Sequence, residues 1–229
     1  MKYNPNILKE SVSIKQYPNS EREVEVPFVL DNMPEPPARV LDVGCCDSDL
    51  VLMFNELGFD ATGIDVRVGP NYGDDKYGQM FDVGDARELP YDDQSFDVVT
   101  CVSALEHFGF PENGYHSDTD QDETAQCKAM GEMLRVLKVG GILILTLPYG
   151  QYDPEAGWDK WVKFYNPERV INLFEGAYAT KPIEMEAVTI KFDIRDENGW
   201  HTCTEEEAAA NVSGKDVTSS VKLIARRIR

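Results

Sequence analysis

Lysine and arginine are scarce in this 229-residue sequence. Only 22 of them stand against 41 aspartate and glutamate residues, so the formal net charge is −19. Binding to nucleic acids or to anionic membrane surfaces depends largely on lysine and arginine. We therefore expect neither a nucleic-acid nor a membrane partner, and the composition favours a small-molecule ligand at a local site.

Cysteines and long apolar runs are also few. The five cysteines form no CxxC pair and are odd in number, which argues against a disulfide framework or a zinc ribbon and favours a reducing cytoplasm. The longest apolar run, at 142–147, is far shorter than the ~20 residues of a membrane span. The first ten residues lack the apolar core of a signal peptide. We expect a cytoplasmic protein.

Three prolines at 34–37 make the clearest change in composition, and no internal repeat is present. They separate a lead segment, 1–37, from a single domain, 38–229, whose length is ordinary for one domain. The lead segment has three open roles: a lid, the arm of a homodimer, or packing against the domain.

Predicted strands and helices alternate from residue 39 onward. Apolar spacing predicts helices at 50–57, at 122–137 and from the cap Asn166 to Gly176. The predicted strands are 40–43, 61–64, about 80–81, 96–102, 142–147, 187–192 and 221–228. The last two have no convincing helix between them, so we expect a terminal hairpin. The order predicts an α/β fold: a Rossmann-like, doubly wound, seven-stranded, mostly parallel sheet with a C-terminal antiparallel hairpin, and a ligand crevice at the carboxyl ends of the strands.

Carboxylates surround the turn that follows the first predicted strand. Asp42, Asp47 and Asp49 lie near Gly44, which is the one glycine of the dinucleotide pattern G-x-G-x-x-G that is present. A pyrophosphate prefers bare N–H groups and positive potential, so this turn favours a cationic ligand. Asp65, about 20 residues downstream at the end of the second strand, is placed to accept hydrogen bonds from ribose hydroxyls.

Over residues 39–148 the sequence resembles the class I S-adenosylmethionine-dependent methyltransferases. The resemblance is carried by Val40-Leu-Asp-Val-Gly-Cys45, Gly63-Ile-Asp65, Gly84-Asp85-Ala86 and Arg135-Val-Leu-Lys-Val-Gly-Gly-Ile142, in the family's order. It implies S-adenosylmethionine as cofactor, with Asp85 at the adenine amino group. The cofactor-binding residues it implies are Asp42, Gly44, Cys45, Cys46, Asp65, Val66, Asp85, Ala86 and Ser103. Cys46 and Ser48 replace glycines that family members often carry, which predicts an altered turn. For this reason a cofactor-binding protein without transfer activity remains an alternative.

Catalytic candidates follow the fourth strand. An activated methyl sulfonium needs an aligned nucleophile and, for a hydroxyl, a group that accepts its proton. We predict His107 as this base, with Glu106 supporting it. The Glu-His pair resembles the end of the metal-assisted quinone O-methyltransferase pattern, but Ser103 stands where those enzymes carry another glutamate. No metal is therefore predicted, and a substrate-side metal at His116 is the lesser alternative.

Aromatic residues follow the fifth strand and are typical either of a sugar-stacking surface or of a loop that covers the core. Together with His116, the predicted substrate residues are Tyr149, Tyr152, Trp158, Trp161 and Tyr165. Their arrangement is similar to that of bacterial methyltransferases of sugar and polysaccharide biosynthesis. This implies O-methylation of a sugar or nucleotide-linked sugar, with N-methylation of an amino sugar or another small molecule as the alternative.

Overall fold

An eight-stranded sheet forms the centre of the computed structural model, which describes residues 15, 18–46, 48–68, 78–110, 122–153, 155, 162–179, 183–214 and 216–229. Its order is β3-β2-β1-β4-β5-β10-β7-β8. The strands that pair in parallel are β1 (Arg39–Val43), β2 (Asp60–Asp65), β3 (Phe81–Val83), β4 (Phe96–Val102) and β5 (Leu137–Pro148). The predicted doubly wound, mostly parallel α/β fold is confirmed.

The two predicted C-terminal strands are present and pair antiparallel as expected, but a third strand joins them and their order in the sheet differs from a hairpin added at the edge. The three strands are β7 (Met185–Asp196), β8 (Gly199–Cys203) and β10 (Ser219–Arg227), and each pairs antiparallel with its neighbours. The last strand lies between β5 and β7, so the sheet has eight strands and β8 forms its edge. Nearly every residue of β10 is buried, as an interior strand requires.

A short helix and a small second sheet, also not predicted, follow β8. The helix α7 (Glu205–Ala210) begins with a capping box, in which Thr204 and Glu207 bond each other's backbone N–H groups. The strand β9 (Val212–Ser213) then pairs in parallel with β6 (Gln151–Tyr152). The prediction of no helix in this region was therefore wrong.

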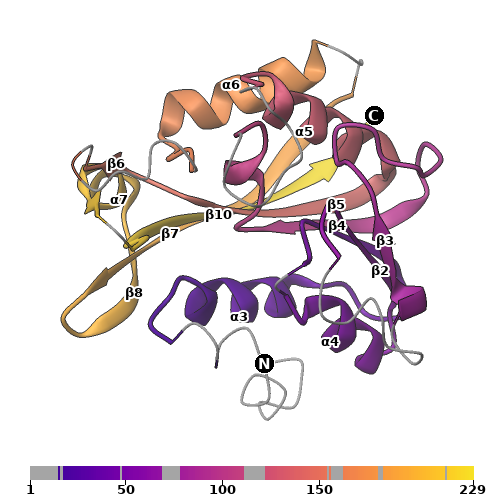
Figure 1. The fold of residues 1–229 in the computed structure, drawn as a ribbon, viewed down its shortest axis with the longest axis horizontal. Coiled ribbons are helices and arrows are strands. Elements are labelled where there is room, and N and C mark those ends of the chain that lie inside the picture. The colour runs from indigo at the N-terminus through magenta and orange to yellow at the C-terminus, as the bar shows by residue number, and fades with distance from the viewer. Residues whose placement is uncertain are drawn as a thin grey trace.

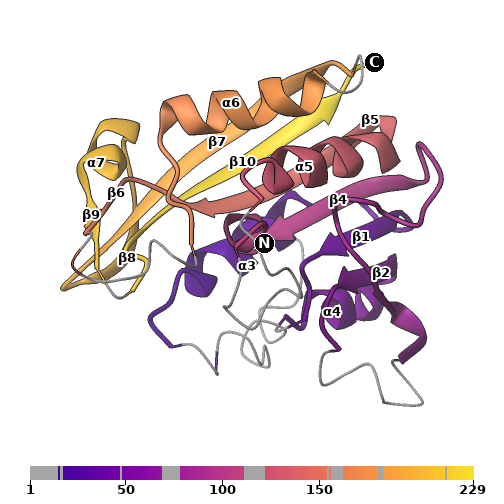
Figure 2. The same ribbon diagram turned by 45° about the horizontal axis from the view of Figure 1, so that its top comes forward.

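Two helices cover each face of the main sheet. Figures 1 and 2 show α3 (Arg22–Asn32) and α4 (Leu50–Glu56) on one face, and α5 (Ala125–Val136) and α6 (Pro167–Tyr178) on the other. None of the helices among the described residues has the length and apolar character needed to cross a membrane.

Both predicted helices on the second face are present with shifted ends. The α5 helix is shorter than the predicted 122–137, because Leu137 already belongs to β5. Asn166 caps α6 as predicted, accepting a hydrogen bond from the Arg169 N–H at 2.9 Å. Gly176 does not end α6. It lies inside the helix, where an added Cβ would stand 2.6 Å from the Cys127 sulfur of α5, so the glycine permits close helix packing.

The α3 helix comes from the lead segment and is part of the core. Val26, Val29 and Leu30 are buried against the sheet, in a cluster shared with β1 and α4. The helix accommodates Pro27 in its interior. Residues 22–32 therefore pack as an integral layer of the fold, and the chain just before them reaches the carboxyl ends of the strands.

Candidate functional site

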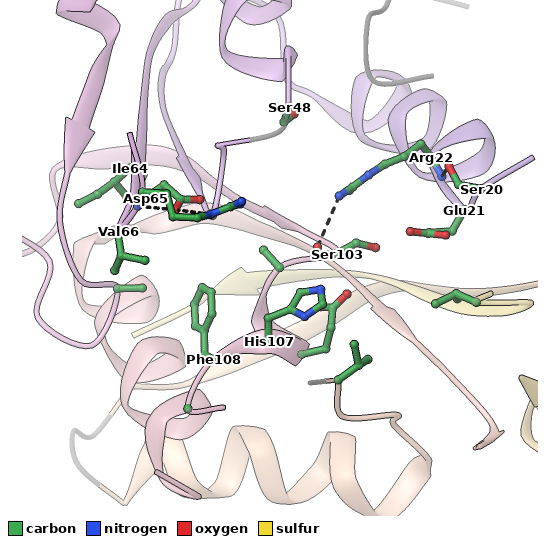
Figure 3. A pocket seen from close by; sticks show the side chains of 18 of the residues that line it. Ser20, Glu21, Arg22, Ser48, Ile64, Asp65, Val66, Ser103, His107 and Phe108 are labelled. Atoms are coloured by element: carbon green, nitrogen blue, oxygen red, sulfur yellow. Dashed lines mark hydrogen bonds and ion pairs between the residues drawn. The ribbon is translucent and has the colours of Figure 1, made fainter. Parts of the chain in front are cut away.

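A cavity of about 590 Å³ lies at the carboxyl ends of the parallel strands. Figure 3 shows Asp65 and Val66 on one side of it, Glu21 and Arg22 on the other, and His107 between them. The lining segments are 18–22, 64–67, 84–87, 103–104 and 106–109, with Gly44, Ser48, Val162, Arg195, Asp216 and Val217. The sequence-predicted residues that the structure brings to this cavity are Gly44, Asp65, Val66, Asp85, Ala86, Ser103, Glu106 and His107.

The turn after β1 is drawn tightly against the end of β4. Gly44 has φ +80°, and a Cβ added there would lie 2.4 Å from the Cβ of Ala104. Asp65 holds this turn from β2, because its Oδ2 accepts the Cys46 N–H at 3.0 Å and its Oδ1 accepts the Arg67 N–H at 2.9 Å. The glycine conformation and the carboxylate together shape one end of the cavity.

Three predicted cofactor residues have their side chains outside the described lining of the cavity. Asp42 is 2% exposed and accepts a hydrogen bond from the Thr100 hydroxyl at 2.6 Å. Burial raises the pKa of Asp42 to about 7. The sulfur of Cys45 packs beneath Gly63, and Cys46 bonds Asp65 through its backbone. These three residues are therefore not among those that line the cavity, and their place in the cofactor site stays a prediction.

Two arginines, missed in the sequence, accompany the acidic residues of this end. Arg87 contacts Asp85 through Nε and Nη2, the latter at 2.6 Å from Oδ2, and also pairs with Asp122 at 3.5 Å. The Nε of Arg67 lies 3.5 Å from Oδ1 of Asp65. The only signal for either in the sequence is its place two residues after the aspartate. The acidic turn is consequently less negative than the sequence suggests.

The opposite end of the cavity is organised by α3. Arg22 donates to the carbonyl of Val102 at 2.8 Å and lies 3.5 Å from the carboxylate of Glu25. Glu25 is fully buried and accepts hydrogen bonds from the hydroxyls of Ser103 and Ser220. Ser103 has φ +43°, so these contacts hold an unusual backbone conformation just before the catalytic candidates.

Glu106 lies on the cavity wall, in the short helix η2 (Leu105–His107). Its carbonyl accepts the Lys163 N–H at 3.0 Å and the Gln126 side-chain amide at 3.4 Å. Burial raises the pKa of the Glu106 carboxyl well above its ordinary value. Among the described residues, its Oε2 has no hydrogen-bond partner, and the support of His107 by Glu106 stays a prediction.

The aromatic residues predicted for the substrate separate into different places. Tyr149 and Tyr165 are each 1% exposed, and their hydroxyls donate to Glu205 at 3.1 Å and to Gln126 at 2.9 Å. These two are core residues, which corrects their assignment to the substrate. Tyr152 stacks on Phe164 and borders a second cavity of about 470 Å³, which shares Val162 with the first. The predicted residues His116, Trp158 and Trp161 lie outside the described part of the chain.

Comparison with known proteins gives a consistent result for the central part of the chain. Residues 41–145 match the methyltransferase domain family. The chain is 34% identical over 135 residues to the uncharacterised methyltransferase YcgJ of Bacillus subtilis, covering 56% of this chain and 47% of that protein. It is also 34% identical over 140 residues to the 2-methyl-6-phytyl-1,4-hydroquinone methyltransferase of Synechocystis, covering 58% and 39%. The chain thus spans less than half the length of these relatives.

A solved structure extends the likeness to nearly the whole chain. The 1,6-didemethyltoxoflavin-N1-methyltransferase of Burkholderia thailandensis, solved with its substrate and S-adenosylhomocysteine, superposes with a TM-score of 0.58 and 13% identity, covering 98% of this chain and 82% of that one. At this identity the comparison shows a common fold.

Proposed function

We propose that this chain, whose residues 41–145 match the methyltransferase domain family, binds S-adenosylmethionine and transfers the cofactor's methyl group to an oxygen of a sugar or nucleotide-linked sugar. The observation that carries the proposal is a single cavity lined both by Asp65 and Asp85 and by His107. Such a cavity has room for a cofactor and a small acceptor at the strand ends, where doubly wound folds bind ligands.

The residues of the β1–β2 side fit the cofactor. Asp65 would accept hydrogen bonds from the ribose hydroxyls, Asp85 would face the adenine amino group, and the turn at Gly44 would approach the methionine part. When bound, S-adenosylmethionine supplies a methyl group already activated on a sulfonium. Asp65 is suited to its role because its carboxylate is fixed by the Cys46 and Arg67 N–H groups.

His107 is suited to the role of base. His107 would take the proton of the acceptor hydroxyl on its neutral imidazole while the acceptor oxygen bonds the methyl carbon in place of the sulfonium sulfur. A base positioned in this way contributes ~10²–10⁴ in rate. The ring lies between the two sides of the cavity in Figure 3, which supports a place between cofactor and acceptor.

The polar wall contributed by the lead segment and the C-terminal strands suits a hydroxyl-rich acceptor. Arg22 and Asn19 border this end together with Arg195 and Asp216. The cavity therefore contains both hydrogen-bond donors and hydrogen-bond acceptors, as recognition of a sugar requires. An amine is the second candidate, and Glu21 and Asp216 on the wall favour it because carboxylates attract a cation.

The test is His107→Ala, assayed by formation of S-adenosylhomocysteine over a panel of sugars, nucleotide-linked sugars and amines. We expect turnover on a hydroxyl acceptor to fall by ~10²–10⁴, because the base is lost, while cofactor affinity measured by calorimetry stays unchanged. The acidic limb of the wild-type pH profile should disappear with the imidazole. His201→Ala, on the half-exposed β8, is the matched control and should behave as wild type.

Near wild-type turnover in His107→Ala would assign the proton transfer to another group. Cofactor binding without turnover on any acceptor would favour the non-catalytic alternative instead.

A further inference from the structure

The Glu106 carboxyl is the one buried side-chain oxygen on the described wall of the cavity that lacks a partner. Its residue is 3% exposed, its Oε2 is unpaired among the described residues, and it lines the cavity beside His107. Buried polar atoms in native proteins nearly always have a hydrogen-bond partner, and one that lacks a partner calls for an explanation such as a catalytic role or a bound water or ion. The unpaired oxygen therefore points to a contact with a bound molecule.

The backbone of Glu106 is held from two directions. The Lys163 N–H, on the chain leading to α6, donates to its carbonyl at 3.0 Å. The Gln126 amide, on α5, donates to the same carbonyl at 3.4 Å and itself accepts from the Tyr165 hydroxyl. This clamp joins two elements far apart in the sequence and fixes where the carboxyl begins.

Burial and the neighbouring carboxylates favour the protonated form of the Glu106 carboxyl. Arg22, the nearest guanidinium in this group, is paired with Glu25 and bonded to the carbonyl of Val102. Burial raises the pKa of Glu106, the carboxylates of Glu25 and Glu21 raise it further, and Arg22 lowers it. The titratable groups that face it from the surrounding elements are Arg22, Glu25 and Glu21 of the lead segment, Cys101 of β4, its neighbour His107, and Tyr165 before α6.

We propose that Glu106 binds the acceptor as a neutral acid, donating a hydrogen bond from Oε2 to a lone pair of the acceptor's hydroxyl or ring oxygen. A hydroxyl can receive this bond while giving its own proton to His107, whereas an ammonium group has no lone pair to offer. Glu106 would thus select an oxygen acceptor over a protonated amine. The inference rests on the proposed oxygen methylation and adds the residue that recognises the acceptor.

The variants Glu106→Gln and Glu106→Leu separate a neutral donor from an ionised group. Glutamine keeps a neutral hydrogen-bond donor of the same size, so we expect turnover within a few-fold of wild type. Leucine removes the donor and should lower kcat/KM on a hydroxyl acceptor by about 10–100-fold. Glu175→Gln on the exposed face of α6 is the control and should not change turnover.

The pH profile gives a second readout that a merely structural role would not move. Wild-type turnover should fall on the alkaline side as Glu106 ionises, and Glu106→Gln should lose this limb while retaining activity. A Gln variant as inactive as the Leu variant, or a Gln variant with the same alkaline limb, would overturn the proposal.

A direct measurement separates this inference from the proposed function. In the complex with S-adenosylhomocysteine, the infrared difference between wild type and Glu106→Gln at neutral pH should contain the band of a protonated carboxyl. Its absence overturns the inference whatever the acceptor. Hydroxyl methylation that needs His107 but is unaffected in Glu106→Leu overturns the inference alone. Transfer to amines only, with the protonated band present, overturns the oxygen acceptor in both proposals and leaves the protonation state of Glu106 established.

Discussion

Buried carboxyl groups from three different elements act electrostatically on one guanidinium, that of Arg22. Glu25 comes from α3, Asp42 from β1 and Glu106 from the turn after β4, and each is at most 3% exposed. All three act on Arg22, which is the cation they share. One positive charge would not compensate three ionised carboxylates in a buried place, so burial raises the pKa of each carboxyl.

The raised pKa of Asp42 has a measurable effect on the stability of the protein as a function of pH. This pKa is about 7 in the fold, above the ordinary value of 3.8. Between these two pH values the folded protein keeps the proton of Asp42, whereas the unfolded chain releases it. Stability from this group is complete below pH 3.8 and is lost as the pH rises through about 7. The asparagine side chain of an Asp42→Asn variant would not ionise, and it would retain an oxygen for the Thr100 hydroxyl.

We therefore expect the stability advantage of Asp42→Asn over wild type to grow by about 2–3 kcal/mol between pH 5 and pH 8. Urea unfolding at the two pH values measures it, because the other buried carboxyls are common to both proteins. A constant difference between the two curves would show that Asp42 is ionised in the fold.

Asp65 carries the most specific expectation for cofactor binding. Asp65→Ala removes charge-assisted hydrogen bonds to the ribose and should weaken S-adenosylhomocysteine binding by ~1.5–3 kcal/mol in calorimetry. Asp60→Ala, at the exposed opposite end of β2, should bind as wild type does. Because Asp65 also holds the Cys46 N–H, Asp65→Asn serves as a second variant that keeps one acceptor oxygen. An unchanged dissociation constant in both folded variants would remove Asp65 from the site.

The residues predicted from the sequence are those whose role depends on a local pattern. Gly44, Asp65 and Asp85 each follow a strand, and strand ends meet in this fold. Arg22 could not be assigned in this way, since the carbonyl it contacts lies 80 residues away. The assignment of Tyr149 and Tyr165 to the substrate failed for a related reason. The sequence around an aromatic residue at a strand end is the same whether its hydroxyl binds a ligand or a residue of the core.

At the scale of elements, local signals for two missed helices were present. Thr204-Glu-Glu-Glu207 has the spacing of a capping box and begins α7. Val26, Val29, Leu30 and Met33 have helical spacing, although Pro27 argues against a helix interior. The position of β10 between β5 and β7 could not be predicted, because it depends on long-range pairing that no local pattern specifies.

The burial of α3 predicts that the lead segment contributes to folding and is not only a lid. Leu30 is fully buried, so Leu30→Ala should lower the free energy of unfolding by about 2–5 kcal/mol. Its neighbour Asp31 is exposed, and Asp31→Ala should change stability by less than about 0.5 kcal/mol. Denaturant unfolding compares the two. Equal stability of both variants would mean that the packing of α3 is dispensable and would return the segment to the role of a lid.

The lead segment also joins the two ends of the molecule. The Asn19 carbonyl accepts hydrogen bonds from Arg195 of β7 and from the Trp200 indole of β8, while Arg22 bonds the end of β4. The chain from 18 to 25 therefore spans from the added C-terminal strands to the central parallel strands and walls the cavity between them. The end of the cavity that we propose for the acceptor is thus lined by residues 18–22 and by Arg195, Asp216 and Val217.

At the scale of the whole molecule, the cavity lining is richer in arginine than the net charge of the chain would suggest. The chain carries a net charge of −19, whereas the cavity lining contains four arginines, which are Arg22, Arg67, Arg87 and Arg195. Arg67 and Arg87 pair with Asp65 and Asp85, so the proposed cofactor end is locally balanced. Selection between cofactors must then come from the field of the whole protein together with the shape of the site.

This balance predicts a selective thermal response. S-adenosylhomocysteine has no net charge and fits the proposed site, so at 100 times its dissociation constant it should add about 2.7 kcal/mol, which is roughly 5–10 °C in Tm for a domain of this size. NAD carries a pyrophosphate that a strongly acidic protein repels, and the turn at Gly44 lacks the other glycines of a dinucleotide site. We expect NAD to leave Tm unchanged at low salt. Repeating the scan in high salt separates the two causes: stabilisation by NAD only in high salt would mean that charge alone excludes it, whereas no response at either salt assigns the exclusion to the turn. Stabilisation by NAD but not by S-adenosylhomocysteine would contradict the proposed cofactor site.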